Sequence, residues 1–326
     1  MILVTGASGF IGGHVARRLV GRGHAVRVLV RLTSDLSCIG DLRLERADGD
    51  LRDIRSLRKA IRGCRQLYHV AADYRLWATN PEEIYRSNVD GTRNILEAAA
   101  EAGLEKVVYT STVGTIGIPA GGALGTEDFP VSDRDITGHY KRSKFEAEQV
   151  ALEFASQGLP LVIVNPTAPV GEGDLKPTPT GKIIVDFLRG AMPAYVDTGL
   201  NLVDVRDVAE GHLLAAERGR AGQRYILGAR NMTLRQIFEA LGTISGKPAP
   251  RLRLPYWMAL GFSLGEVAAT RLTGSEPRAP LEAVRMARKK MFVSTDKAER
   301  ELGFRPGPVE DALRRAVTWF QKHRYC

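Results

Sequence analysis

A tyrosine and a lysine four residues apart carry the clearest chemical signal in the sequence. Tyr140 and Lys144 lie in HYKRSKFEAE, a stretch with helical composition, where this spacing places both side chains on one helix face. A tyrosine hydroxyl has a pKa of about 10, and a nearby ammonium stabilises the phenolate and lowers that pKa. The pair therefore indicates proton transfer at neutral pH, whereas a packed ring beside a surface lysine is the structural alternative.

A hydroxyl at the end of a predicted strand supports the chemical interpretation. The run KVVYTST (106–112) is apolar and β-branched, which is typical of a buried strand, and it ends at Thr112. A hydroxyl at this position can hold the carbonyl or alcohol oxygen of a substrate beside Tyr140.

Three glycines near the start of the chain predict a binding site for a pyrophosphate. The run ILVT has the pattern of a buried strand, Gly6, Gly9 and Gly12 follow it, and FIGGHVARRLV continues with helical spacing. The first glycine permits a tight turn, the second admits the pyrophosphate, and the third lets the helix pack on the strand. The helix N-terminus adds free N–H groups. A glycine-rich turn without a ligand is the alternative.

Two polar residues follow the next strands, where a bound dinucleotide would place its adenosine. Arg31 directly follows AVRVLV (25–30), and an arginine there can pair with a 2′-phosphate and favour NADP over NAD. Asp50 follows LRLERAD (42–48) and can accept a hydrogen bond from the adenine amine. A solvated arginine and an ordinary loop carboxylate are the alternatives.

The rest of the chain alternates strands and helices, which predicts an α/β fold with a doubly wound parallel sheet of the Rossmann type. Further helices are expected at DIRSLRKAIRG, at EEIYRSNVDGTRNILEAAAEAG and over 140–157, and further strands over 66–72 and in LPLVIVNP. Residues 1–168 are expected to form the cofactor-binding domain, completed by 201–228. Residues 169–200 and 229–326 are expected to form a smaller, mainly helical substrate region, and 166–182 is too irregular for an element.

Together, these motifs resemble the extended short-chain dehydrogenase/reductase family over essentially the whole chain. TGASGFIG matches the family's TGxxGxxG, YKRSK its YxxxK and VYTST its strand-end Ser/Thr, while NVDGT (88–92) and HVAA match two further motifs. Within the family, AVRVLVR, the NPT of 165–167 and ARKKMFVSTDKAERELGFRP are most similar to the hopanoid-associated sugar epimerases. Those proteins in turn resemble dihydroflavonol reductases.

The resemblance implies roles for individual residues. Tyr140 would be the acid/base, Lys144 would hold the nicotinamide ribose, and Thr112, with Ser111 as the fallback, would orient the substrate oxygen. Asn88 would support the active-site structure or its water. The implied cofactor contacts are Gly6, Gly9, Phe10, Ile11, Gly12, Arg31, Asp50, Leu51, Val70, Ala71, Ala72, Asn88, Thr110, Tyr140, Lys144, Pro166 and Thr167.

The implied activity is NAD(P)-dependent hydride transfer at a secondary alcohol or ketone, with NADP favoured by Arg31. The resemblance favours a sugar epimerase linked to hopanoid lipid synthesis. A carbonyl reductase similar to dihydroflavonol reductase or hydroxysteroid dehydrogenase is the second interpretation, and a cofactor-sensing regulator the non-enzymatic one. Val113 stands where the family's dehydratases carry an acid, which disfavours dehydration. Leu200 stands where epimerases carry a diphosphate-clamping arginine, which argues against a nucleotide-sugar substrate.

Composition and charge bear on metal binding, nucleic-acid binding and the location of the protein. Of the 326 residues, 44% are hydrophobic and 25% are charged, as in an ordinary soluble protein. The three cysteines (Cys38, Cys64 and Cys326) form no CxxC pair and the six histidines are scattered, so we expect no metal site and a reducing, cytoplasmic location. No nucleic-acid motif accompanies the net charge of +9. The expected partners are a small-molecule substrate and a second copy of the chain in a homodimer.

The apolar stretch 254–272 raises a separate question. Its apolar residues recur at three- and four-residue intervals and predict a helix with a continuous apolar face: Trp257, Leu260, Leu264, Ala268 and Leu272. Packing of this face on the C-terminal region is the first interpretation. Peripheral contact with the inner face of an anionic membrane is the second, aided by Arg285, Arg288, Lys289 and Lys290, which are otherwise expected on a solvated helix face.

Overall fold

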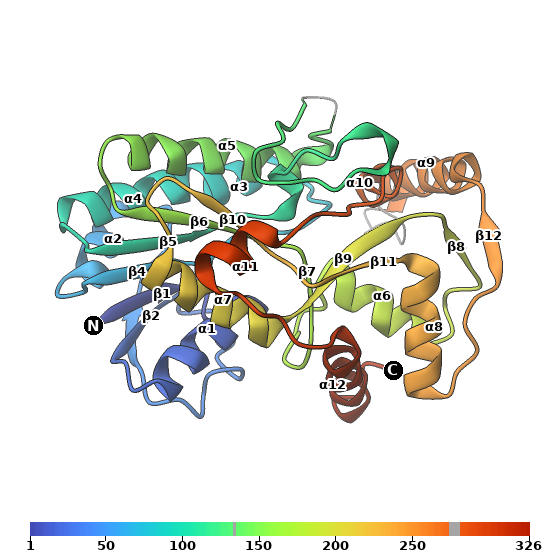
Figure 1. The fold of residues 1–326 in the computed structure, drawn as a ribbon, viewed down its shortest axis with the longest axis horizontal. Helices are drawn as coiled ribbons and strands as arrows, with labels where there is room; N and C mark the ends of the chain where they lie inside the picture. The colour runs from blue at the N-terminus through green and yellow to red at the C-terminus, as the bar shows by residue number, and fades with distance from the viewer. Residues whose placement is uncertain (133–134, 274–280) are drawn as a thin grey trace.

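Seven parallel strands form the central sheet of the computed structural model, which describes residues 1–132, 135–273 and 281–326 (Figure 1). The strand order is β10-β6-β5-β4-β1-β2-β3. The strands are β1 (Ile2–Thr5), β2 (Val26–Val30), β3 (Glu45–Asp48), β4 (Gln66–His69), β5 (Lys106–Thr110), β6 (Leu161–Pro166) and β10 (Arg224–Leu227). The order reverses between β1 and β4, where such sheets bind ligands beyond their carboxyl ends. This confirms the predicted doubly wound α/β fold.

Helices cover both faces of this sheet because its strands are apolar on both sides. All four residues of β1 are buried, for example. One face carries α1 (Phe10–Gly21), α7 (Val205–Arg218) and α11 (Asp296–Leu302), and the other carries α2 (Ile54–Ile61), α4 (Gly91–Glu101) and α5 (Gly138–Ser156) (Figure 1).

The single helix expected from EEIYRSNVDGTRNILEAAAEAG is interrupted. It consists of α3 (Glu82–Tyr85), a π-helical turn (Arg86–Asp90) and α4. Such turns are frequently found at functional sites, and this one contains Asn88.

The remaining elements form two small sheets with a helical cover and a core of their own. One sheet has the order β11-β9-β7 and the other pairs β12 with β8. The strands are β7 (Ala168–Val170), β8 (Ala194–Val196), β9 (Gly199–Asp204), β11 (Arg230–Thr233) and β12 (Leu252–Leu254). The helices are α6 (Pro179–Leu188), α8 (Leu234–Ser245), α9 (Tyr256–Thr273), α10 (Leu281–Met286) and α12 (Val309–Lys322).

The expectation that 166–182 contains no element is wrong. β7 lies within it, and α6 begins within it because Thr178 caps that helix: its side chain accepts from the Gly181 N–H at 3.1 Å, and Pro179 takes the first helical position. Downstream, α7 packs on the large sheet and β10 pairs with β6, as expected, whereas β9 joins the small sheet. The division into two domains stays a prediction.

The predicted helix at 254–272 is present as α9, but its apolar face is not packed. Trp257 is 70% exposed and Leu264 50%, so packing of these two side chains on the C-terminal region is wrong. Leu260 is half-buried, and the side chains of Ala268 and Leu272 lie outside the described part of the structure. No helix among the described residues is long and apolar enough to cross a membrane.

The basic cluster that follows also differs from the expectation of one helix face. α10 ends at Met286, so only Arg285 belongs to the helix. Arg288, Lys289 and Lys290 lie in the segment after it, and all three are exposed.

Candidate active site

The three glycines between β1 and α1 form a cradle that side chains would fill. Gly6 has a φ of +73°, and a Cβ there would lie 2.6 Å from the Ala71 nitrogen. A Cβ on Gly12 would lie 2.2 Å from the Gly6 carbonyl oxygen. Gly9 is the N-cap residue of α1, and the first turn of α1 contains no acidic residue. Free N–H groups and the positive end of the helix dipole therefore face this turn, as binding of a diphosphate requires.

The two residues predicted to meet the adenosine lie at the carboxyl ends of β2 and β3. Arg31 is exposed, and its backbone N–H donates to the Ser34 hydroxyl at 3.0 Å. The Asp50 carboxylate accepts two hydrogen bonds from the Arg52 guanidinium, at 2.9 and 2.7 Å. These bonds, together with the charges of Arg52 and Arg31, lower the pKa of Asp50 to about 2. The Asp50 carboxylate is thus charged at neutral pH and is already engaged by Arg52.

The segment that follows β4 is fixed by a threonine that sequence reasoning missed. The Thr5 hydroxyl accepts from the backbone N–H groups of Val70 and Ala71, each at 3.2 Å. It also bonds the buried His69 ring at 2.8 Å, and the other ring nitrogen lies 3.2 Å from the Thr92 hydroxyl. Burial lowers the pKa of His69 to about 3, so the ring is neutral. These hydrogen bonds hold Val70 and Ala71 beside Gly6, and the partly buried Ala72 follows them.

The structure brings Tyr140 and Thr112 together at the carboxyl end of β5. The Tyr140 side chain, in the first turn of α5, lies close enough to the Thr112 side chain for the two hydroxyls to interact. Thr112 caps the short 3₁₀ turn after β5, where its Oγ1 accepts from the Gly114 N–H at 3.1 Å. The fallback residue Ser111 is buried instead, with its hydroxyl 3.5 Å from that of Thr115. Thr112 is therefore the strand-end hydroxyl beside the tyrosine.

The pKa of Tyr140 differs from the expectation. Burial raises it above the ordinary tyrosine value, and the interaction with Thr112 opposes that rise only in part. The lowering expected from Lys144 is not seen, because the ammonium is held elsewhere. Tyr140 is therefore protonated at neutral pH.

Lys144 is buried one helical turn beyond Tyr140 and is held by β5. Its Nζ donates to the Thr110 carbonyl at 2.8 Å and to the Tyr109 hydroxyl at 3.0 Å, above the Tyr109 ring. Burial lowers the pKa of Lys144 to about 8, while the charge of Glu148 acts in the opposite direction. Of the three N–H groups of an ammonium, two are thus bonded, and the third meets no acceptor within the described parts of the chain.

Asn88 connects the π-helical turn to the catalytic helix. Its Oδ1 accepts from the Asp73 N–H at 2.7 Å, and its Nδ2 donates to the Asp73 carbonyl and the Ser143 hydroxyl, both at 2.9 Å. Ser143 in turn donates to the Tyr140 carbonyl at 2.8 Å. The buried amide of Asn88 therefore fixes the start of α5 relative to the segment after β4.

A buried glutamate on α5 anchors the same strand ends, and sequence reasoning missed it. Glu148 lies two turns beyond Tyr140, and its side chain is fully buried. It accepts from the hydroxyl of Thr115 at 2.8 Å, from the amide of Asn165 at 2.9 Å and from the guanidinium of Arg224 at 3.1 Å. The Asn165 amide also donates to the Thr112 carbonyl at 3.1 Å. The sequence did contain a signal for this role. Glu148 follows Lys144 at the same four-residue interval that separates Tyr140 and Lys144, which places all three side chains on one helix face.

The other predicted contact residues lie around these groups. The Thr110 hydroxyl is 2.9 Å from the buried His212 ring, and the Thr167 N–H donates to the Leu227 carbonyl at 3.1 Å. Pro166 ends β6, Phe10 and Ile11 begin α1, and Leu51 packs against Gly91. Their roles toward a cofactor stay predictions. No group of three metal-ligating side chains occurs among the described residues.

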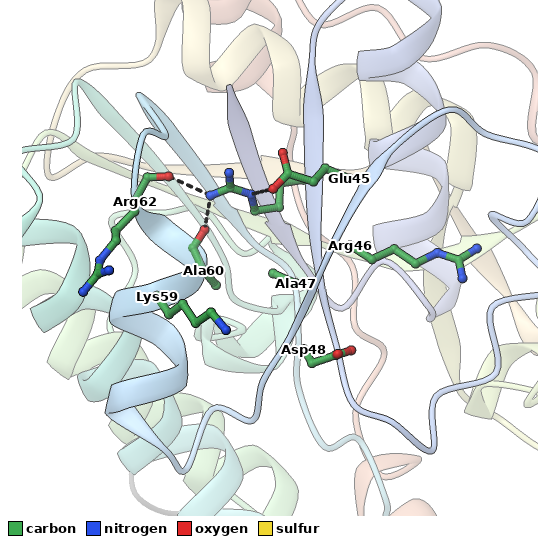
Figure 2. Close-up of a pocket in the computed structure, with 8 residues that line it drawn as sticks. Glu45, Arg46, Ala47, Asp48, Lys59, Ala60 and Arg62 are labelled. Atoms are coloured by element: carbon green, nitrogen blue, oxygen red, sulfur yellow. Dashed lines mark hydrogen bonds and ion pairs between the residues drawn. The ribbon is translucent and has the colours of Figure 1, made fainter.

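A pocket of about 270 Å³ lies elsewhere, between β3 and α2 at the edge of the sheet (Figure 2). Arg27 lines it and donates to the carbonyls of Ala60 and Arg62, both at 2.7 Å, and to Glu45. Arg27 thus satisfies the last carbonyls of α2, a structural role. The pocket contains none of the predicted catalytic residues.

The extended short-chain dehydrogenases/reductases share this architecture. They have a parallel sheet, a glycine-rich turn at the carboxyl end of its first strand, and a strand-end hydroxyl near a tyrosine on the following helix. The chain belongs to the NAD dependent epimerase/dehydratase family, whose model matches residues 2–228. It is an enzyme of the oxidoreductase/epimerase kind that this family comprises.

Relatives match along nearly the whole chain. The chain is 47% identical over 326 residues to the putative dihydroflavonol 4-reductase of Synechocystis sp., which covers 99% of this chain and 95% of that protein. It is 36% identical over 322 residues to sterol demethylase protein B of Methylococcus capsulatus, covering 98% of each. Among solved structures, the crystal structure of gox2253 is similar with a TM-score of 0.89 and 48% identity, covering 99% of this chain and 98% of that one.

Proposed function

We propose that the protein is an NADP-dependent carbonyl reductase that acts on a ketone, or in reverse on a secondary alcohol, of a lipophilic small molecule. The observation that carries this proposal is the contact between the Tyr140 phenol and the Thr112 hydroxyl, one helical turn from the Lys144 ammonium. The names of the relatives, a dihydroflavonol 4-reductase and a sterol demethylase protein, support a polycyclic substrate.

The residues present fit a dinucleotide. The glycine cradle and the N-terminus of α1 would take the diphosphate, and Arg31 would pair with a 2′-phosphate. The third N–H of Lys144 would be free for the nicotinamide ribose, beside the segment of Val70 and Ala71. When bound, the cofactor supplies the hydride for the reduction.

The side chains of the site then manage the substrate oxygen and its proton. A ketone oxygen placed between Thr112 and Tyr140 would accept a hydrogen bond from each hydroxyl as negative charge develops on it. Tyr140 gives its proton to that oxygen, and its raised pKa ensures that the proton is present at neutral pH. Asn88, through Ser143, holds the backbone of Tyr140 in place.

A sugar epimerase linked to hopanoid lipid synthesis is the second candidate. It would use the same Tyr140, Lys144 and Thr112, and it rests on the resemblance of the NPT of 165–167 and of the C-terminal stretch. Leu200, at the expected place of a diphosphate-clamping arginine, packs in the small-sheet core and pairs with Met232 across β9 and β11. This environment supports a substrate without a nucleotide diphosphate. A homodimer stays a prediction for either activity.

The two activities differ in whether reducing equivalents are consumed. The purified enzyme is incubated with NADPH deuterated at C4 and a panel of 3-ketosteroids, dihydroflavonols and ketosugars. A reductase consumes one NADPH per product and leaves deuterium on the new carbinol carbon, whereas an epimerase interconverts sugars without net loss of NADPH. Absence of both deuterium transfer from NADPH and sugar interconversion with NADP⁺, in a protein that binds the cofactor, would contradict both activities and favour a cofactor-sensing regulator.

A further inference from the structure

The exposed side of α9 is apolar to an unusual degree. Its exposed side chains are Trp257 at 70%, Phe262 at 59%, Leu264 at 50% and Met258 at 44%, and the other exposed positions between 257 and 265 are the glycines Gly261 and Gly265. At 3.6 residues per turn these six positions span an arc of about 160°. This arc, called here the α9 face, contains no charged or polar side chain.

Two polar residues of α9, Ser263 and Glu266, lie on its inner side, which reverses the usual arrangement. Ser263 is fully buried and Glu266 is half-buried, and both have interaction partners. A surface helix of a globular protein ordinarily turns its charged residues outward and its apolar ones to the core. Contiguous exposed apolar surface of this kind marks a site of protein or membrane contact.

A basic surface adjoins the α9 face. A cavity of about 330 Å³ lies between β12, the start of α9 and the segment after α10, and its lining includes Arg253, Arg288 and Asp197. Asp197 pairs with Arg253 at 2.9 Å and with Lys290 at 3.2 Å. Arg288 and Arg251 are exposed and form no ion pair with any residue in 1–132, 135–273 or 281–326. Within the described part of the chain, Asp197 is therefore the one carboxylate in the cavity lining, where it meets the cations Arg253, Arg288 and Lys290.

We propose that the α9 face docks on the surface of an anionic lipid bilayer, with this basic surface against the headgroups. Tryptophan and phenylalanine on one helix side, with cations beside them, have the chemistry of an interfacial helix whose apolar side enters the acyl boundary. The cations then lie at the depth of phosphate groups, to which juxtamembrane Lys and Arg are attracted. α9 lies on the membrane and does not span it.

Docking here places the active site close to the membrane. α9 packs on α10, and the Glu282 carboxylate of α10 accepts from the His139 N–H at 2.8 Å, directly before Tyr140 (Figure 1). The α9 face therefore lies near the start of α5, the helix that carries Tyr140. The docking itself does not depend on the proposed reaction.

The proposal is tested by sedimentation of the full-length protein with vesicles of phosphatidylcholine alone or with 30% phosphatidylglycerol. We expect binding to the anionic vesicles at 50 mM salt and a loss of at least five-fold at 500 mM, since salt screens surface charges. Trp257→Ser/Phe262→Ser should weaken binding at least ten-fold, and Arg251→Gln/Arg288→Gln several-fold. Leu124→Ser and Arg43→Gln/Arg46→Gln are matched controls at exposed positions elsewhere and should bind normally.

A second readout locates the contact. Trp257 is exposed, whereas Trp77 and Trp319 are partly buried. Lipids brominated in the acyl chain should therefore quench the tryptophan fluorescence of the wild-type protein and leave that of Trp257→Phe unchanged. Absence of binding to anionic vesicles at low salt by the folded protein would overturn the proposal. A dimer that Trp257→Ser/Phe262→Ser dissociates, without vesicle binding, would also overturn it and assign the α9 face to a second copy.

Discussion

Replacement of Tyr140 by phenylalanine isolates the proton-transfer step. The variant keeps the ring that α5 packs and removes only the hydroxyl that meets Thr112. Loss of a positioned general acid lowers turnover by about 10²- to 10⁴-fold. The fold should tolerate the change, because the Thr112 hydroxyl still bonds the Gly114 N–H, so stability should change by no more than about 1.5 kcal/mol.

The assay compares single-turnover hydride transfer, NADPH affinity by fluorescence titration, and thermal unfolding. Tyr85→Phe is the matched control, because Tyr85 packs on His139, next to Tyr140, with its hydroxyl 3.3 Å from that ring. We expect Tyr140→Phe to bind NADPH normally and transfer hydride at least 100-fold more slowly, and Tyr85→Phe to behave as wild type. A Tyr140→Phe rate above a tenth of wild type would refute Tyr140 as the acid.

Three further perturbations test the surroundings of Tyr140. Arg31→Ala should weaken NADPH binding about ten-fold or more without affecting NADH binding, since a charge-assisted bond contributes about 1.5–3 kcal/mol before solvent screening. The two affinities are measured by parallel titrations, and an equal fall in both would contradict the NADP assignment. Because burial places the pKa of Lys144 at about 8, NADPH affinity should fall as the pH rises through about 8, and Lys144→Met should lack this pH dependence. The same depressed pKa means that the unfolded chain binds more protons between about pH 8 and 10.4, so Lys144 raises stability as the pH increases through that window. Glu148→Ala should cost about 3–5 kcal/mol in urea unfolding because it removes the carboxylate that accepts from Arg224, Thr115 and Asn165, although Arg224 keeps its bond to the Glu127 carbonyl. Glu148→Gln should cost less because an acceptor for Thr115 remains, so equal losses would contradict the network.

Features encoded by short spacings were predictable from the sequence. The glycines at 6, 9 and 12 act within one turn of chain, and the pair Tyr140 and Lys144 within one turn of helix, so their relative placement follows from local geometry. The order of strands and helices was likewise visible in the apolar pattern. The parallel sheet and its family could therefore be inferred before the structure was known.

Features that depend on distant segments were not predictable. Glu148 bonds Arg224, which is 76 residues away, and Thr5 bonds His69, 64 residues away, so neither network leaves a local pattern. The pKa of Tyr140 was expected in the wrong direction for the same reason, because the partners of Lys144 lie on β5, 34 and 35 residues earlier. The face of α9 was predicted from periodicity, but periodicity does not reveal what that face packs against.

The direction of Tyr140's pKa shift has a consequence for the reaction. A general base must lose its proton at the working pH, whereas a general acid must keep it, and burial of Tyr140 favours the neutral phenol. Lys144 does not offset this effect while its ammonium is bonded to Tyr109 and Thr110, and the same burial reduces its own charge above about pH 8. A neutral phenol can protonate the alkoxide that forms when a ketone is reduced, which agrees with the proposed role of Tyr140 as the general acid.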